Sequence, residues 1–176
     1  YLNEYVPDYN QRLRWLTGFT GSSGLVLLID DRCLFFTDGR YLVQAKKEIS
    51  DLFEIIDSST QNIFDWLLKN VPKEKHICVD QNINSISFIQ KLEKVAKKNR
   101  ISMGFSKKIL IDNIRNVQGY SNKNKAYLLP NKLSGKNSKV KIQNLKMKIK
   151  NIDYFIITDP HSVNWLLNIR GNDLQY

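Results

Sequence analysis

The spacing of apolar residues changes along the chain and predicts an alternation of strands and helices. Residues 25–29 and 33–36 are continuous apolar runs around a short polar break, which is typical of a hairpin buried on both faces. Apolar runs at 53–56, 77–79 and 101–105 predict three more strands. Apolar residues recur at helical spacing in the segments between these strands, at 40–49, 63–68 and 88–96. This order predicts an α/β domain with a mixed or parallel sheet and helices packed on its faces.

Two helix starts can be predicted in this first part. Asp8 is expected to cap a short helix over 12–16, because a side-chain oxygen before a helix accepts hydrogen bonds from its first backbone N–H groups. Arg40 follows the turn 37–39 and is expected to open the next helix. The glycine-containing segment 18–24 between them is predicted to be a loop.

The pattern changes in the last third of the chain. A basic helix is expected after Asn137 or Ser138, then a strand over 154–157, and then a helix that begins at Asp159 and Pro160. One strand with two helices cannot bury its own hydrophobic face, so this second domain is predicted to be incomplete. The predicted organisation is a first domain, a polar linker and a partial second domain, over 1–112, 113–137 and 138–176.

Charge is distributed unevenly over the 176 residues. The net charge is +10, and the residues after Asp112 hold 11 basic and 3 acidic side chains. This leaves open a basic, non-enzymatic binding module, for example one for RNA. However, 20 lysines accompany only 7 arginines, whereas nucleic-acid recognition favours the arginine fork. We therefore expect a solvated lysine surface and no nucleic-acid partner.

Few features indicate a location for the protein. The longest apolar run, 25–29, is far shorter than a membrane helix, and no signal peptide is recognisable at the start of the sequence. Cys33 and Cys78 lie in apolar runs without metal-ligand spacing, so both are expected to be core residues in a reducing compartment. The expected location is the cytoplasm, with no contact to a membrane.

Several motifs resemble one known family. Residues 4–7 (EYVP) and 12–22 (RLRWLTGFTGS) resemble the N-terminal domain of the three-domain aminopeptidase P family. Residues 38–41 (DGRY) lie where that family has an Asp-Gly-Arg-Tyr turn, and 165–173 (WLLNIRGND) resembles a signature of its second domain. The motifs follow the family's order and approximate spacing, so the resemblance spans nearly the whole chain.

The resemblance implies a creatinase-type fold for the first domain and a related fold for the second. It also implies a parent enzyme, an Xaa-Pro aminopeptidase, that releases an N-terminal residue linked to proline. In the family two divalent metals, usually manganese, are bound by carboxylates and a histidine in a third, C-terminal "pita-bread" domain. This sequence contains no counterpart of that domain. The chain is therefore expected to be a non-catalytic portion, inactive on its own, whose partner is the catalytic domain; a homodimer is left open.

Arg40 is the one substrate-binding candidate. It follows a turn at the end of a strand, where α/β proteins place functional groups. The resemblance implies that this arginine reaches toward the substrate cleft, where a guanidinium could pair with a peptide carboxylate. The alternative is a structural salt bridge with Asp38 or a neighbour.

No catalytic residue and no metal ligand is predicted. His76 and His161 have no partner at ligand spacing, so both are interpreted as structural residues. The glycines of the loop are ascribed to backbone geometry, since no Lys-Ser or Lys-Thr pair follows at the spacing of a phosphate-binding loop. Trp15 and Trp165 are expected to be anchors in a hydrophobic core.

Overall fold

The computed structural model describes residues 6–106, 110–115 and 124–172. The chain forms two compact units, over 1–120 and 121–176. Among the described helices of both units, none is long and apolar enough to cross a membrane.

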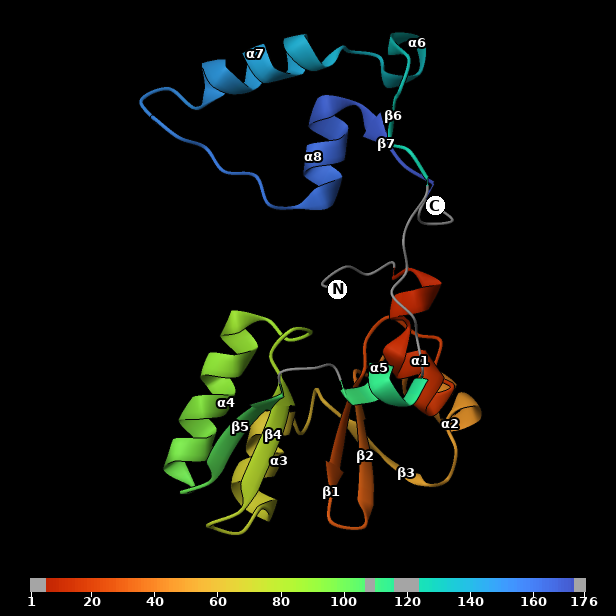
Figure 1. Ribbon diagram of the computed structural model, residues 1–176, viewed down its shortest axis with the longest axis vertical. Coiled ribbons are helices and arrows are strands. Elements are labelled where there is room, and N and C mark those ends of the chain that lie inside the picture. Colours follow the sequence, from red (N-terminus) through yellow and green to blue (C-terminus); the bar gives the residue numbers. More distant parts are fainter. Residues whose placement is uncertain (1–5, 107–109, 116–123, 173–176) are drawn as a thin grey trace. The chain divides into compact units, whose positions relative to one another are not determined.

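The strands of the first unit form a mixed arrangement (Figure 1). Strands β1 (Leu25–Ile29), β2 (Arg32–Thr37) and β3 (Phe53–Asp57) make one sheet in that order. β1 is antiparallel to β2, and β2 is parallel to β3. Strands β4 (His76–Asp80) and β5 (Ser102–Ser106) make a separate parallel pair. The predicted hairpin and the α/β fold with a mixed sheet are confirmed, but the five strands are divided between two sheets.

Helices separate the strands that follow the hairpin in the predicted order, and the first and last helical elements of this unit are additions to the prediction. The helical elements are the 3₁₀ helix η1 (Asp8–Asn10) and the α-helices α1 (Arg12–Thr17), α2 (Leu42–Glu48), α3 (Ile63–Asn70), α4 (Ile86–Lys98) and α5 (Leu110–Arg115). Asn62 caps α3 by accepting hydrogen bonds from the N–H groups of Phe64 and Asp65. Ser85 caps α4 in the same way through the N–H of Phe88.

Two predicted helix starts are wrong. Asp8 lies inside η1, and the residue before α1 is Gln11, whose side chain makes no capping hydrogen bond. A turn of 3₁₀ helix therefore takes the place of the expected cap. Arg40 lies in a turn, and α2 begins at Leu42. The turn is closed by a hydrogen bond from the N–H of Tyr41 to the carbonyl of Asp38, which places Arg40 outside the helix.

The alternation of side chains along β2 gives the first unit its layers. Leu34 and Phe36 lie in a core that includes Trp66 and Leu67 of α3 and residues of α4. Phe35, between them, lies in a second core with residues that include Phe19, Ala45 and Ile49. Successive side chains of a strand point to opposite faces, so α3 and α4 cover one face while α2 and the loop before β1 cover the other.

Some residues expected in the core are exposed. Trp15 is 49% exposed and Trp165 is 59% exposed, whereas Trp66 is the tryptophan that is buried in the core. The Trp15 ring is contacted instead by the guanidinium of Arg115, whose Cζ lies 5.9 Å from the ring centroid. Cys78 is also exposed, because its position on β4 points away from the core side chains.

The second unit contains little regular structure. Its elements are β6 (Tyr127–Leu128), α6 (Asn131–Ser134), α7 (Ser138–Lys148), α8 (Pro160–Leu167) and β7 (Ile169–Arg170), with β6 antiparallel to β7. The predicted caps are present: Asn137 accepts a hydrogen bond from the N–H of Val140, and Asp159 accepts one from the N–H of Ser162. The predicted strand at 154–157 is wrong. That segment has no strand partner among the described residues, and a strand is defined by its pairing.

In the described part of the second unit, polar side chains are buried and large apolar side chains are exposed, which is the opposite of an ordinary domain. Among its described residues, the buried ones are Lys141 and Asn168, both of them polar. Large apolar side chains are exposed instead, for example Tyr154 and Ile156. The unit thus lacks an apolar core of its own in the described part.

Candidate functional site

The candidate site lies at the carboxyl end of β2, and we call it the Arg40 edge: the loop 18–24 together with the turn 38–41. The two segments are joined by hydrogen bonds. The hydroxyl of Thr37 donates to the carbonyl of Ser23 at 2.6 Å, and the hydroxyls of Ser22 and Tyr41 share a bond of 2.8 Å. A loop and a turn that are far apart in the sequence therefore form one surface.

The loop is also tied to α2. Glu48 accepts hydrogen bonds from the backbone N–H of Thr20 at 2.8 Å and from its hydroxyl at 2.9 Å. Gln44 donates to both the Thr20 hydroxyl and the Glu48 carboxylate. The N–H of Thr20 is the largest of the contributions that lower the pKa of Glu48. A charged Glu48 thus holds the loop against the helix.

Glycines let this loop pack closely. Gly18 ends α1 with φ of 80°, a left-handed conformation that favours glycine. A Cβ at Gly21 would lie 2.8 Å from a ring carbon of Tyr41, which is too close for any other residue. Gly18 thus serves backbone geometry, as the sequence indicated, whereas Gly21 makes room for neighbouring aromatic rings.

Arg40 is held by the acid two residues before it. Its Nε and Nη2 donate to the two carboxylate oxygens of Asp38, each at 2.9 Å, and its backbone N–H donates to Oδ1 at 3.1 Å. The guanidinium carbon also lies 5.3 Å from the centroid of the Tyr41 ring. The Arg40 side chain is nevertheless 73% exposed. The pair is therefore oriented and accessible, and it combines a cation, an anion and two hydroxyls on one edge.

The arginine changes the acidity of its partner. Hydrogen bonding to the Arg40 guanidinium holds the pKa of the Asp38 carboxyl well below its usual range, and the Ser23 hydroxyl adds to this. Partial burial of the carboxyl acts in the opposite direction but is the smaller effect. Asp38 is thus ionised throughout the physiological pH range.

This pairing predicts the response of the Arg40 edge to acid. A carboxyl whose folded pKa is depressed stabilises the folded state above its unfolded pKa, about 3.9, and this contribution is lost as the pH falls toward the folded value. We expect the Asp38 carboxyl to stay ionised down to about pH 3 in a ¹³C NMR titration of the chain. Arg40→Ala should return its midpoint toward about 3.9, whereas Arg32→Ala should leave it unchanged. If the titration midpoint of the Asp38 carboxyl is the same in Arg40→Ala as in the unchanged chain, the pairing is contradicted.

The metals that the resemblance implies do not fit the residues described here. His76 shares a hydrogen bond of 2.9 Å with the hydroxyl of Ser102 on the neighbouring strand, and His161 is exposed in the first turn of α8. Within the described ranges, no three His, Cys, Asp or Glu side chains form a group that could hold a metal ion.

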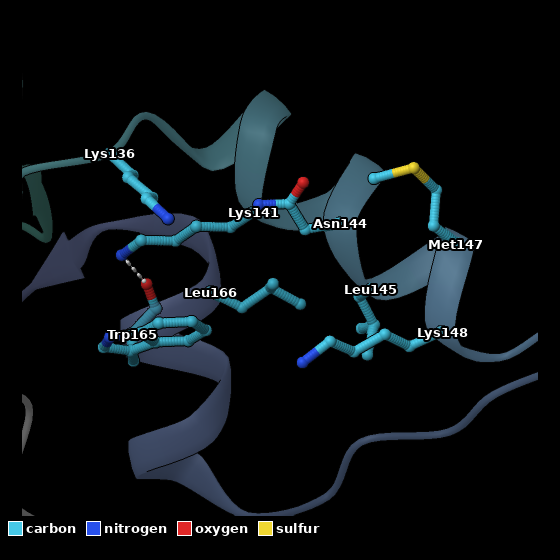
Figure 2. Close-up of a pocket in the computed structure, with 8 residues that line it drawn as sticks. All are labelled: Lys136, Lys141, Asn144, Leu145, Met147, Lys148, Trp165 and Leu166. Carbon is cyan, nitrogen blue, oxygen red and sulfur yellow. Dashed lines mark hydrogen bonds between the residues drawn. The ribbon is translucent and has the colours of Figure 1, made fainter.

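Two clusters could not be predicted from the sequence. Asp112 on α5 binds Arg12 on α1 through two hydrogen bonds of 2.9 and 2.6 Å, and this pair joins the two helices. Asp112 also contacts Arg115 within α5. In the second unit a pocket of about 410 Å³ lies between α7 and α8, with the buried Lys141 in its lining (Figure 2). The joined residues are far apart in the sequence, and no spacing rule connects them.

Comparisons with known proteins cover the whole chain. Residues 5–117 match the model of the Creatinase/Prolidase N-terminal domain, and residues 118–176 match a second model with the same description. The chain is 31% identical over 188 residues to Xaa-Pro aminopeptidase 1 of Dictyostelium discoideum, covering 99% of this chain and 30% of the relative. It is 32% identical over 177 residues to Aminopeptidase P1 of Lotus japonicus, covering 99% of this chain and 27% of the relative.

A solved structure gives the same result in three dimensions. The X-prolyl aminopeptidase from Caenorhabditis elegans, described as a cytosolic enzyme with a di-nuclear active site, matches 98% of this chain with a TM-score of 0.80 and 27% identity. The match covers 29% of that enzyme, so the chain spans less than a third of the length of each of these proteins. With both units matched by models of one description, the chain belongs to the Creatinase/Prolidase N-terminal domain family.

Proposed function

We propose that the chain is the non-catalytic N-terminal portion of an Xaa-Pro aminopeptidase, which positions substrate and contacts the catalytic domain. The parent enzyme releases an N-terminal residue linked to proline. The surface that this chain contacts belongs to a catalytic domain outside this sequence. One observation carries the proposal. Nearly the whole chain, 98%, superposes on under a third of an X-prolyl aminopeptidase with a TM-score of 0.80.

Arg40 is the residue proposed to contact substrate. Its guanidinium is 73% exposed at the end of a strand, and Asp38 fixes its orientation. An exposed guanidinium whose orientation is fixed in this way can attract a peptide carboxylate without a large loss of side-chain entropy. A group that contacts substrate across a domain interface must face outward from its own domain, and the exposure of the Arg40 guanidinium meets this requirement.

Two finer points belong to the same proposal. We propose the domain limits 1–112, 113–137 and 138–176, in which the polar middle segment connects the two domains and its β6 and α6 belong to the compact second unit. We also propose that the protein works in the cytoplasm, which is supported by the description of the C. elegans enzyme as cytosolic.

A peptidase assay tests the proposal. The pure chain is expected to release no N-terminal residue from an Xaa-Pro peptide, with or without manganese. The reason is chemical: a two-metal hydrolytic site needs a cluster of carboxylate and imidazole ligands around an activated water.

A further inference from the structure

The ion pair of Arg40 with Asp38 holds the guanidinium at two points. Nε and Nη2 of Arg40 donate to the two carboxylate oxygens of Asp38, each at 2.9 Å. Two contacts define an axis, and a planar guanidinium is still able to tilt about that axis. The side chain is 73% exposed, so packing on its own surface restricts this tilt only weakly. A third contact therefore decides how firmly the plane of the guanidinium is held.

The ring of Tyr41 supplies this third contact. The guanidinium carbon of Arg40 lies 5.3 Å from the ring centroid, within the distance of about 6 Å at which a ring face attracts a cation. The N–H of Tyr41 donates to the carbonyl of Asp38 at 2.9 Å, which closes the turn and keeps the three residues together. The ring thus lies against the guanidinium and opposes its tilting.

The Tyr41 ring is itself held on two sides. The ring of Phe19, which is 1% exposed, meets it edge to face with centroids 5.7 Å apart and an angle of 87° between the planes. The Tyr41 hydroxyl shares a hydrogen bond of 2.8 Å with the hydroxyl of Ser22. The core therefore fixes the body of the ring, and the loop 18–24 fixes its tip.

Ser22 is a firm support for the ring because the loop is anchored before and after it. Before it, the N–H of Thr20 donates to the carboxylate of Glu48 at 2.8 Å. After it, the carbonyl of Ser23 accepts a hydrogen bond of 2.6 Å from the hydroxyl of Thr37 on β2. The position of the Ser22 hydroxyl is thus set by α2 and by the central strand of the sheet.

We propose that Tyr41 and Ser22 are positioning residues for Arg40. The ring of Tyr41 supports the guanidinium, and the hydroxyl pair of Tyr41 with Ser22 holds the ring in place. The contribution of these residues to turnover rests on the substrate contact proposed above for Arg40. The orientation of the guanidinium, in contrast, is a property of this chain alone, so the two are measured separately.

The first test measures hydrogen exchange at the Nε–H of Arg40 by ¹⁵N NMR of the full chain. This proton exchanges with water when its bond to Asp38 opens, so the exchange rate reports how firmly the guanidinium is held. Tyr41→Leu should raise the rate about fivefold, because the ring face is lost. Tyr41→Phe and Ser22→Ala remove the same hydroxyl pair, so each should raise the rate about twofold and the double variant no further.

Arg12 provides an internal control in the same spectra. Its Nε and Nη2 donate to the carboxylate of Asp112 at 2.9 and 2.6 Å, which is the same two-point geometry outside the Arg40 edge. The exchange rate at its Nε–H should be the same in all variants. Circular dichroism checks that each variant is folded. Tyr41→Phe and Ser22→Ala keep the aromatic rings of the core, so they carry the test if Tyr41→Leu does not fold.

A double-mutant cycle tests whether Tyr41 acts on catalysis through Arg40. In a chimera in which this chain replaces the matching 30% of the Dictyostelium discoideum relative, Tyr41→Leu should lower kcat/KM for an Xaa-Pro peptide about fivefold. In the Arg40→Ala background the same substitution should have no further effect, because the guanidinium that the ring supports is absent. Ser87→Ala breaks a hydroxyl pair of 3.1 Å with Ser85 at the start of α4 and should leave kcat/KM unchanged.

Two outcomes would overturn the proposal. Exchange at the Arg40 Nε–H that is no faster in Tyr41→Leu than in the unchanged chain would mean that the ring does not hold the guanidinium. A loss of kcat/KM that keeps its full size in the Arg40→Ala background would assign Tyr41 to the stability of the fold or to a direct contact with substrate. An unchanged kcat/KM in Arg40→Ala itself would contradict the proposed function alone, since the exchange rates are measured on the chain by itself.

Discussion

Replacement of Phe35 by alanine is expected to lower the free energy of unfolding of the first unit by about 3–5 kcal/mol. Phe35 is completely buried on the central strand of its sheet. Its ring meets the ring of Phe19 edge to face, with centroids 4.9 Å apart. Ala45 and Ile49 of the α2 side close the same core. The substitution therefore leaves a cavity between the sheet and α2, and urea unfolding followed by circular dichroism measures its effect.

The control for this prediction lies on the neighbouring strand. Leu28 is also apolar and part of the hairpin, but its side chain is 61% exposed. Leu28→Ala should change the free energy of unfolding by less than about 1 kcal/mol, as expected for a surface substitution. If both variants unfold at the same urea concentration, the core around Phe35 does not stabilise the first unit.

Loss of Arg40 is expected to have the largest effect on catalysis. The test uses a chimera in which this chain replaces the matching 30% of the Dictyostelium discoideum relative. Arg40→Ala should lower kcat/KM for an Xaa-Pro peptide, with a loss of about 2–5 kcal/mol in transition-state stabilisation. This magnitude is that of a guanidinium desolvated against its partner in the assembled enzyme. Arg40→Lys should recover only part of the loss, because a point charge cannot reproduce a two-pronged contact.

A matched arginine on the same unit provides the control. Arg32 pairs with Glu54 at 2.6 Å on the surface, and the two side chains are 51% and 54% exposed. Arg32→Ala removes the same kind of group away from the Arg40 edge and should leave kcat/KM nearly unchanged. Equal losses from the two variants would reduce Arg40 to a structural role, and its pair with Asp38 would then be an ordinary salt bridge.

The apolar pattern was sufficient to predict the first unit because its core is built from local runs. Residues 33–36 are apolar at every position, and the structure uses both faces of that strand. The pairing of Asp38 with Arg40 was also foreseeable, since the two residues are close in the sequence. The attachment of the loop to Glu48 was not, because it joins residues 28 positions apart.

The second unit was harder to predict for a physical reason. Residues 154–157 have the composition of a strand, but a strand also needs a partner, and the described residues supply none. The charge pattern predicts that Lys141 is a solvated lysine, but it is buried. Its burial depends on the position of the α8 carbonyls, which no local pattern of charge or spacing encodes.

The most direct test of the central claim is the peptidase assay of the pure, full chain. An Xaa-Pro peptide is incubated with the chain, with and without manganese, and the released N-terminal residue is quantified; the unmodified chimera with the Dictyostelium discoideum catalytic portion serves as the positive control. We predict no release by the chain under either condition and metal-dependent release by the chimera. Metal-dependent release of the N-terminal residue by the chain alone would contradict the claim that it is a non-catalytic portion of the enzyme.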